Sequence, residues 1–370
     1  MKKEKEIVFF IPNIEGGGIE KNLVLLSKYL IENNYKVKII YHKISSNFKL
    51  KLNSKIILIK SKKLLQLNFR NQRISNSINC FIFTLLSVKL PKNSVLISMQ
   101  DHPFGIIISL IKKIPSIIRI ANHPVGSLKF FNSYLIYKFK LLIKLIFYHF
   151  ATAIVCNSKM SADFFKKKII IKKKIILIYN PIENFIKNKK NIKRNKNQLL
   201  TVGRIEKQKN FPGILNAIHL LSKENKKIKL IIVGSGSEKE NIINQAKELK
   251  IIDRIIFKNF ISPQDYYRKS GILILNSFFE GLPNVLIESM QYKIPIISTD
   301  CASGPKEILK NERYGYLIKV NDSISLAKKI NYVISNYEKA LKKTNYGYKS
   351  LDRFQINNQC KKYEKLIRKI

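Results

Sequence analysis

Residues Gly271–Ser298 have the sequence GILILNSFFEGLPNVLIESMQYKIPIIS, a pattern that predicts a strand, a helix and a second strand. Two apolar runs, Gly271–Leu275 and Ile294–Ser298, flank a helical pattern that begins near Pro283. Proline is favoured in the first turn of a helix, where its missing N–H has no partner to lose. Strands that are apolar throughout and separated by a helix are typical of a parallel sheet covered on both faces.

The same alternation extends along the chain in both directions. In the first half it predicts strands at Ile7–Ile11, Lys36–Tyr41, Ile56–Ile59, Val95–Ser98, Ser116–Ile120, Ala153–Cys156 and Ile175–Tyr179. In the second half it predicts strands at Leu199–Gly203, Lys229–Gly234, Ile255–Phe257, Gly271–Leu275, Ile294–Ser298 and Tyr314–Ile318. We therefore expect an α/β fold of two doubly wound, Rossmann-like parallel-sheet domains that face a ligand cleft.

The domain boundaries follow from changes in composition. Asn180-Pro181 ends the first half, and residues 184–198 are polar, basic and without periodicity, which predicts a linker. The domains are expected at residues 1–183 and 199–345. Residues 346–370 are expected to form a C-terminal helix that crosses back.

The charge of the chain is strongly basic. Its 370 residues include 69 Lys and Arg against 24 Asp and Glu, a formal net charge of +45. Clustered cations favour nucleic acid, because they release counterions from phosphates. Here the lysines are spread from Lys2 to Lys369, and the abundance of Lys, Ile and Asn is typical of A/T-rich codons. We expect a solvated basic surface without nucleic acid, with an anionic membrane surface as the alternative.

Cysteine spacing and hydropathy limit the class of protein further. The four cysteines, Cys80, Cys156, Cys301 and Cys360, include no CxxC pair, which predicts buried thiols in a reducing compartment and no metal site. The first apolar stretch ends at Pro12, too early for a signal peptide, and no run of about 18 apolar residues predicts a membrane span. We expect a cytoplasmic protein that is at most peripheral on the inner membrane face.

Two cations follow the first strand of the second half. Arg204 and Lys209 lie in GRIEKQKNF, directly after Leu199–Gly203, and could form a pocket for a diphosphate. Such a pair also arises by chance in a chain so rich in lysine. The glycine turn VGSGSE, Val233–Glu238, fits a tight strand-to-helix turn at least as well as a phosphate contact.

Two glutamates flank the start of the helix near Pro283. Seven residues separate Glu280 from Glu288, and Gly281 allows the backbone to turn between them. The amides of the first helical turn, around Asn284 and Val285, would face an anion. Glu288 could accept hydrogen bonds from ribose hydroxyls, and Glu280 from a sugar. Two solvated glutamates are the plain alternative, although acids are scarce in this chain and the flanking residues are apolar.

At this point the chain resembles a known family, the family 4 retaining glycosyltransferases of the two-domain GT-B fold. The resemblance lies in GRIEKQKNF, LIIVGSGSE, FEGLPNVLIE and STDCASGPKEIL, in family order, and is most specific over Leu199–Leu309. It implies that Arg204 and Lys209 bind the donor diphosphate, Glu288 the ribose, and that Glu280 lies by the donor sugar. The SGPKE stretch resembles that of bacterial enzymes that build surface polysaccharides and lipid-linked oligosaccharides.

The expected site residues form two groups. The catalytic candidates are Glu280, Arg204, Lys209 and His123. The donor- and nucleotide-binding candidates are Gly17, Gly18, Gly203, Arg204, Lys209, Gly234, Phe260, Ile261, Glu280, Gly281, Leu282, Asn284, Val285 and Glu288.

In the first half, the glycine loop Gly16–Gly18 could bring backbone amides close to phosphate or acceptor, although it lacks the GxGxxG spacing. Glu20 fits a helix start. His123 follows the strand Ser116–Ile120, and related enzymes place a histidine or an Arg-Asn pair near this point against donor sugar or acceptor. Asp101-His102 is a second candidate. The other histidines, His42, His149 and His219, are interpreted as structural.

The segment Leu128–Phe150 is apolar and aromatic, with interleaved lysines and no acid. One interpretation is a helix in a membrane interface whose Lys side chains reach anionic headgroups. The other is a core helix with one basic face. The lysines in question are Lys129, Lys138, Lys140 and Lys144.

Together with these patterns, the resemblance implies a retaining glycosyltransferase that moves a hexose or N-acetylhexosamine. It is expected to need no metal and no cofactor, because Arg204, Lys209 and the helix amides can neutralise the departing diphosphate. Its donor is a nucleoside-diphosphate sugar, expected to be UDP-linked, and its acceptor a glycan or lipid-linked hydroxyl. A GT-B epimerase or phosphorylase is the first alternative. A non-catalytic basic protein that binds membrane or nucleic acid is the second.

Overall fold

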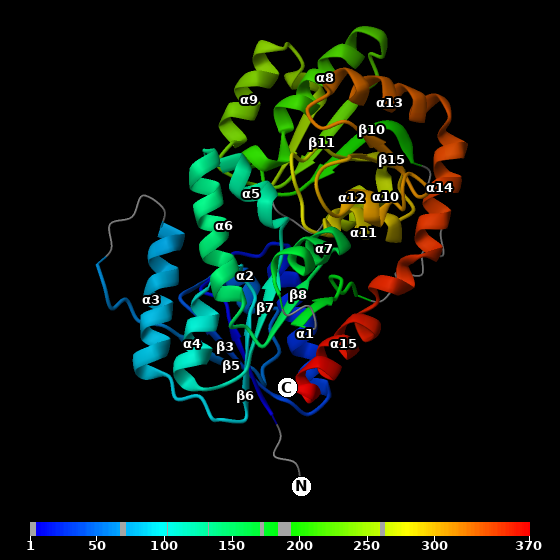
Figure 1. Ribbon diagram of the computed structural model, residues 1–370. Helices are drawn as coiled ribbons and strands as arrows, with labels where there is room; N and C mark the ends of the chain where they lie inside the picture. The colour runs from blue at the N-terminus through cyan, green and yellow to red at the C-terminus, as the bar shows by residue number, and fades with distance from the viewer. Residues whose placement is uncertain are drawn as a thin grey trace. The chain divides into compact units, whose positions relative to one another are not determined.

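The computed structural model describes residues 5–66, 72–101, 103–131, 133–170, 174–183, 194–259 and 263–370. The chain forms two compact units, one of Met1–Glu183 with Phe354–Ile370 and one of Asn184–Arg353. In each unit, helices surround a sheet of parallel strands (Figure 1). The expected α/β class is confirmed.

The first unit is built on a seven-stranded parallel sheet with the order β5-β3-β1-β6-β7-β8-β9. Its strands are β1 (Glu6–Phe10), β3 (Lys36–Tyr41), β5 (Ile57–Lys60), β6 (Ser94–Ser98), β7 (Ser116–Ile120), β8 (Ala153–Cys156) and β9 (Ile175–Leu177), beside a separate pair, β2 (Asn13–Ile14) and β4 (Lys43–Ile44). Ile7 and Phe9 of β1 enter one core, and Val8 and Phe10 enter the other. Because both faces of β1 are buried, its four residues from Ile7 to Phe10 are all apolar.

The helices of the first unit are α1 (Gly18–Glu32), α2 (Ser46–Lys49), α3 (Gln72–Ser87), α4 (Phe104–Lys112), α5 (Pro124–Phe131), α6 (Tyr134–Tyr148), α7 (Lys159–Lys168) and α15 (Ile356–Lys369). The C-terminal helix α15 places Tyr363 and Ile367 in the same core as Leu26 of α1. The Tyr29 hydroxyl also donates to the Glu364 carboxylate at 3.0 Å. The expectation that the C-terminal helix packs back is therefore confirmed.

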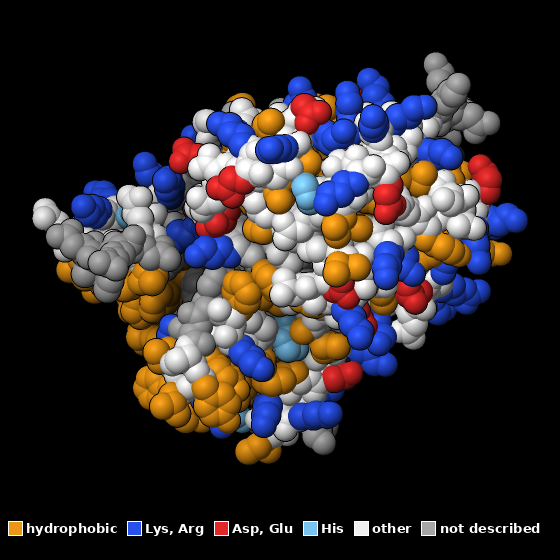
Figure 2. All heavy atoms as spheres, turned by 90° about the horizontal axis from the view of Figure 1, so that it is seen from above, with side chains coloured by type: hydrophobic (Ala, Val, Ile, Leu, Met, Phe, Trp, Pro, Cys, Tyr) orange, Lys and Arg blue, Asp and Glu red, His pale blue; other side chains and the backbone are white. Residues whose placement is uncertain are grey.

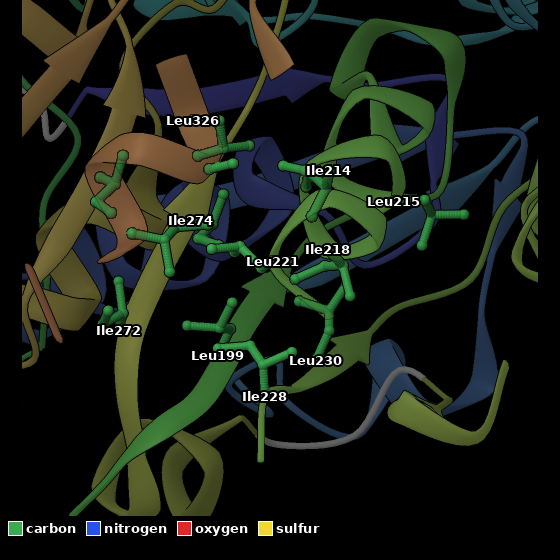
Figure 3. Packing of buried hydrophobic residues seen from close by; sticks show 14 of the residues in the cluster. Leu199, Ile214, Leu215, Ile218, Leu221, Ile228, Leu230, Ile272, Ile274 and Leu326 are labelled. Atoms are coloured by element: carbon green, nitrogen blue, oxygen red, sulfur yellow. The ribbon is translucent and has the colours of Figure 1, made fainter. Parts of the chain in front are cut away.

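The second unit is built on a six-stranded parallel sheet with the order β12-β11-β10-β13-β14-β15. Its strands are β10 (Asn195–Val202), β11 (Lys229–Val233), β12 (Ile255–Lys258), β13 (Ser270–Leu275), β14 (Ile296–Thr299) and β15 (Tyr316–Ile318). Its helices are α8 (Phe211–Glu224), α9 (Lys239–Glu248), α10 (Gln264–Lys269), α11 (Asn284–Gln291), α12 (Pro305–Ile308), α13 (Ser323–Ser335) and α14 (Tyr337–Lys349), with 3₁₀ turns η2 (Lys207–Lys209), η3 (Ile252–Arg254) and η4 (Leu351–Phe354). In Figure 3, Leu199 of β10 and Ile272 of β13 lie in one core with Ile218 of α8 and Leu326 of α13.

Three of the expected boundaries are wrong. The expected linker, 184–198, overlaps β10, because Asn195 and Gln198 pair with neighbouring strands through their backbones, and backbone pairing does not depend on apolar side chains. Residues 184–193 lie outside the described residues. The expected single helix 346–370 is broken by η4, where Leu351 and Phe354 are both fully buried. Residues 128–150 form two helices, because the backbone of Ser133 is extended (φ −61°, ψ 162°).

All four cysteines are buried free thiols, as expected, and burial raises the pKa of Cys80 to about 12. None of the helices in the described ranges combines the length and apolar character needed to cross a membrane.

Candidate active site

The loop after β10 carries Arg204 and Lys209. The backbone of this loop is bonded to the turn after β11, since the Ile205 N–H donates to the Ser235 carbonyl at 2.8 Å. The side chain of Arg204 is exposed to solvent. Lys209 lies on η2, and its side chain is only 18% exposed.

Lys209 meets Glu280, which follows β13. The Nζ of Lys209 lies 2.5 Å from Oε1 of Glu280, and the Ser277 hydroxyl donates to the same oxygen at 2.6 Å. The Glu280 side chain is 7% exposed, so its charge requires a partner. The structure thus brings two of the expected catalytic residues into direct contact. Sequence reasoning missed Ser277.

The backbone around Gly281 is supported by the SGPKE turn. The Ser303 hydroxyl donates to the Gly281 carbonyl at 3.1 Å, and the Glu280 N–H donates to the Ala302 carbonyl at 3.4 Å. Gly304 has φ +83°, and a Cβ added there would lie 2.3 Å from the Gly281 carbonyl oxygen. The close approach of these two turns explains why the motif has glycine at this position.

Glu288 lies on α11 and is half-buried. Its carboxylate accepts a hydrogen bond of 3.0 Å from the hydroxyl of Tyr267, a residue of α10 that is 1% exposed. Burial, and then the Glu288 charge, raises the pKa of Tyr267. Sequence reasoning missed Tyr267, because nothing distinguishes it locally among the 17 tyrosines of the chain.

The first turn of α11 begins where the sequence predicted. Pro283 stands at its N-cap and makes no side-chain hydrogen bond to the helix. Asn284 and Val285 are half-buried in that turn, and Leu282 is buried directly before it. Two further candidates, Phe260 and Ile261, lie outside the described residues.

The VGSGSE turn packs directly on the loop that carries Arg204. A Cβ added at Gly234 would lie 1.9 Å from the Gly203 carbonyl oxygen, and one at Gly236 would lie 2.2 Å from that of Ile205. These glycines therefore allow two backbone segments to approach closely. A phosphate contact at Gly234 stays a prediction.

The other candidates belong to the first unit. Gly17 and Gly18 form the N-cap and first residue of α1. The Nδ1 of His123 accepts a hydrogen bond of 3.1 Å from the Gly126 N–H, and burial lowers the pKa of His123. Glu20 is buried in the first turn of α1 and accepts from the Glu15 N–H at 3.5 Å.

Asp101, the second candidate from the first half, is engaged in contacts within its own unit. Its carboxylate lies 2.8 Å from Nζ of Lys144 and accepts a hydrogen bond from the Tyr148 hydroxyl. Its neighbour His102 lies outside the described residues. Three histidines interpreted as structural bond their own surroundings through Nδ1: His42 with Ser61, His149 with the Leu145 carbonyl and His219 with the Leu249 carbonyl.

The second unit thus presents two cations, a buried carboxylate and the N-terminus of α11 within one set of adjoining loops. Cations and helix N-termini stabilise phosphate, and carboxylates accept hydrogen bonds from hydroxyls. The arrangement suits a ligand that combines a diphosphate with sugar hydroxyls. In the described part of the chain, no three His, Cys, Asp or Glu side chains are grouped as metal ligands.

Comparison with known proteins agrees with this geometry. Residues 182–350 match the family model of the glycosyl transferases of group 1. An N-acetylgalactosamine-N,N′-diacetylbacillosaminyl-diphospho-undecaprenol 4-alpha-N-acetylgalactosaminyltransferase of Campylobacter jejuni is 31% identical over 257 residues, 67% of each chain. The chain belongs to the group 1 glycosyltransferases. This glycosyltransferase is also 35% identical to the amylovoran biosynthesis glycosyltransferase AmsD of Erwinia amylovora, over 39% of its own length and 40% of the relative's.

Solved structures show the fold of the whole glycosyltransferase. The Anabaena protein HepE in complex with UDP-glucose matches with a TM-score of 0.81 and 15% identity, over 99% of this chain and 100% of that one. The expected GT-B fold class is thereby confirmed.

Proposed function

We propose that this group 1 glycosyltransferase is a retaining enzyme of family 4. It transfers a hexose or N-acetylhexosamine from a UDP-linked donor to an acceptor hydroxyl. The product belongs to cell-surface polysaccharide, lipopolysaccharide or lipid-linked oligosaccharide. The observation that carries this proposal is the contact between Lys209 and Glu280, four residues before the first turn of the helix that bears Glu288.

Two relatives support the choice of donor and acceptor. The Campylobacter relative is an N-acetylgalactosaminyltransferase whose substrate is a diphospho-undecaprenol. The Anabaena neighbour holds UDP-glucose. The side chains of the second unit agree with such a donor: the two cations suit a diphosphate, and the two glutamates suit the hydroxyls of a ribose and a sugar.

Transfer breaks the bond between the anomeric carbon and the β-phosphate oxygen and forms a bond from the acceptor oxygen to the same face of that carbon. The departing diphosphate gains negative charge, which Arg204, Lys209 and the amides at the start of α11 stabilise. The acceptor proton passes to the leaving phosphate oxygen. Glu280 orients the donor sugar, and His123 contacts donor sugar or acceptor. Because these groups neutralise the charge of the departing diphosphate, the reaction needs no metal. It also needs no cofactor, since the nucleotide sugar is itself a substrate.

Replacement of Glu288 by alanine is expected to weaken UDP binding about 10- to 100-fold, because hydrogen bonds between a carboxylate and ribose hydroxyls are lost. Isothermal calorimetry with UDP measures the change. Glu224→Ala, on α8, is the control, since its exposed carboxylate bonds only to Asn331 among the described contacts. Equal affinity of the wild type and Glu288→Ala for UDP would contradict the ribose role.

Product analysis separates the transferase from its alternatives. A transferase consumes labelled donor only when acceptor is present. An epimerase converts the donor without acceptor, and a phosphorylase requires inorganic phosphate. A binding protein leaves the donor unchanged under all three conditions.

The helix α6 supports a membrane partner. Among its described residues only Tyr148 is buried, whereas Leu135 is 77%, Phe139 64% and Leu142 56% exposed. The interpretation as a core helix does not agree with this burial. Figure 2 shows apolar side chains gathered at one side of the surface, while Lys and Arg are scattered over the rest.

The charge beside these apolar side chains is basic. Lys129, Lys138 and Lys140 are exposed, whereas Lys144 pairs with Asp101 and is not available to headgroups. We propose that α6 lies in the interface of an anionic bilayer, which places the enzyme on the inner face of the cytoplasmic membrane. The enzyme would bind a lipid-linked acceptor at that membrane surface.

Vesicle sedimentation tests this surface. We expect binding to phosphatidylglycerol vesicles that decreases with salt, little binding to phosphatidylcholine, and a loss of about 10-fold or more in the Leu135→Ser, Phe139→Ser double variant. The matched control is Leu50→Ser, Ile170→Ser, at positions 87% and 85% exposed in the same unit. Binding that is the same for both lipids and is unchanged by both substitutions would contradict the membrane role. The net charge would then reflect only the amino-acid composition of the chain.

A further inference from the structure

The carboxylate of Glu288 contacts one of two tyrosines that stack on each other, Tyr267 of α10 and Tyr292 at the end of α11. The Tyr267 hydroxyl donates to Oε2 of Glu288 at 3.0 Å. The Tyr267 ring stacks on that of Tyr292, with centroids 5.3 Å apart and an interplanar angle of 22°. Both rings are almost fully buried, so the hydroxyl that reaches Glu288 has a defined position.

Arg194 bonds the backbone on which both tyrosines lie. Its Nη1 donates to the carbonyl of Tyr267 at 2.9 Å and to that of Arg268 at 2.5 Å, and its Nη2 donates to the carbonyl of Tyr292. The first two carbonyls belong to the last turn of α10, and the third is at the C-cap of α11. Carbonyls at these positions have no partner within their own helix.

One guanidinium therefore joins the C-terminal ends of two helices. Its charge complements the negative end of both helix dipoles, and its planar fork can donate in several directions at once. A lysine carries the same charge on one flexible nitrogen and cannot hold the same geometry. Burial lowers the pKa of Arg194, but an arginine stays protonated at physiological pH.

We propose that Tyr267 and Arg194 are positioning residues for Glu288: Tyr267 orients the carboxylate that receives the ribose hydroxyls, and Arg194 holds α10 and α11 in the register that this contact needs. The inference rests on the proposed ribose role of Glu288. Arg194 directly precedes β10, so the start of this strand is bonded to α10 and α11, the helices that carry this contact.

The first test is Tyr267→Phe, which keeps the ring and removes only the hydroxyl. We expect UDP to bind about 5- to 20-fold more weakly, as for loss of one hydrogen bond to a charged group. The affinity for 2′,3′-dideoxy-UDP, which lacks the ribose hydroxyls, is expected to stay that of the wild type. A general structural defect would weaken both ligands equally. The control is Tyr316→Phe, a buried tyrosine of β15 whose hydroxyl has no hydrogen-bond partner among the described residues.

The second test is Arg194→Met, with Arg194→Lys as the conservative variant. Both are expected to raise KM for the donor at least 5-fold with a smaller change in kcat, and to spare 2′,3′-dideoxy-UDP. Arg254→Met is the control, because the Arg254 guanidinium donates to the Lys226 carbonyl away from this site. Thermal unfolding of each variant reports any general loss of stability separately.

The outcomes separate this inference from the proposed function. If Glu288→Ala weakens UDP binding while Tyr267→Phe and Arg194→Lys bind UDP as the wild type does, the positioning role is wrong and the ribose role stands. If Glu288→Ala has no effect, the ribose role itself is wrong. In the Glu288→Ala background, Tyr267→Phe is expected to add less than 2-fold; a full additional loss would also overturn the positioning role.

Discussion

Replacement of Lys209 by alanine is expected to lower kcat for sugar transfer about 100- to 1000-fold. The variant loses the ammonium that we propose stabilises the departing diphosphate, and removal of one preorganised electrostatic group typically costs this much. It also leaves Glu280, with a side chain only 7% exposed, without its counter-ion. Turnover of radiolabelled donor in the presence of acceptor measures the effect.

The control for this prediction is Lys207→Ala. Lys207 lies on the same 3₁₀ turn but is exposed, so its removal should leave kcat within about 2-fold. Stability is separated from catalysis by the double variant Lys209→Ala, Glu280→Gln, which removes the unpaired charge. This variant should unfold at a higher temperature than Lys209→Ala without recovering transfer. Full transfer by Lys209→Ala would refute the diphosphate role.

Replacement of Gly234 by alanine is expected to destabilise the second unit by about 3 kcal/mol or more, among the largest effects of a single methyl group. The new Cβ would lie 1.9 Å from the Gly203 carbonyl oxygen. Because the Gly203 oxygen is a backbone atom and a Cβ is fixed directly to the backbone, the clash is relieved only by moving one of the two loops. The midpoint of denaturant unfolding measures the loss.

The neighbouring Ser235→Ala is the matched control for this substitution. Ser235 is exposed, and the bond between its carbonyl and Ile205 does not involve its side chain. Its unfolding free energy should stay within about 0.5 kcal/mol of the wild type. A Gly234→Ala protein as stable as Ser235→Ala would show that the two loops are not closely packed in solution.

The strands of both sheets could be predicted from residue type alone. The run Ile7–Ile11, for example, is apolar at successive positions because β1 is buried on both faces. Residues 195–198 were not predicted as strand, because the start of β10 pairs with β11 and β13 through backbone atoms and carries polar side chains. The break between α5 and α6 escaped it too, since the apolar pattern continues across Ser133.

The candidate site could be derived from the sequence where a residue's expected chemistry depends on its chain neighbours. Glu280, Gly281 and Glu288 are recognisable because they flank one helix start within nine residues. Lys209 was identified in the same way, from the strand that precedes it. The contact between Lys209 and Glu280 joins positions 71 residues apart and had no local signal.

The sequence by itself determined the parallel α/β class, the helix start at Pro283 and the family of glycosyltransferases, since each depends on local pattern and spacing. Only the tertiary structure decided that Glu280 is buried against Lys209, that Tyr267 bonds Glu288, and that Arg194 joins the ends of α10 and α11. The physical reason is that hydrogen bonds and charge pairs act over a few ångströms in space. Residues that are distant along the chain meet only once the sheet and its crossover helices have brought them together.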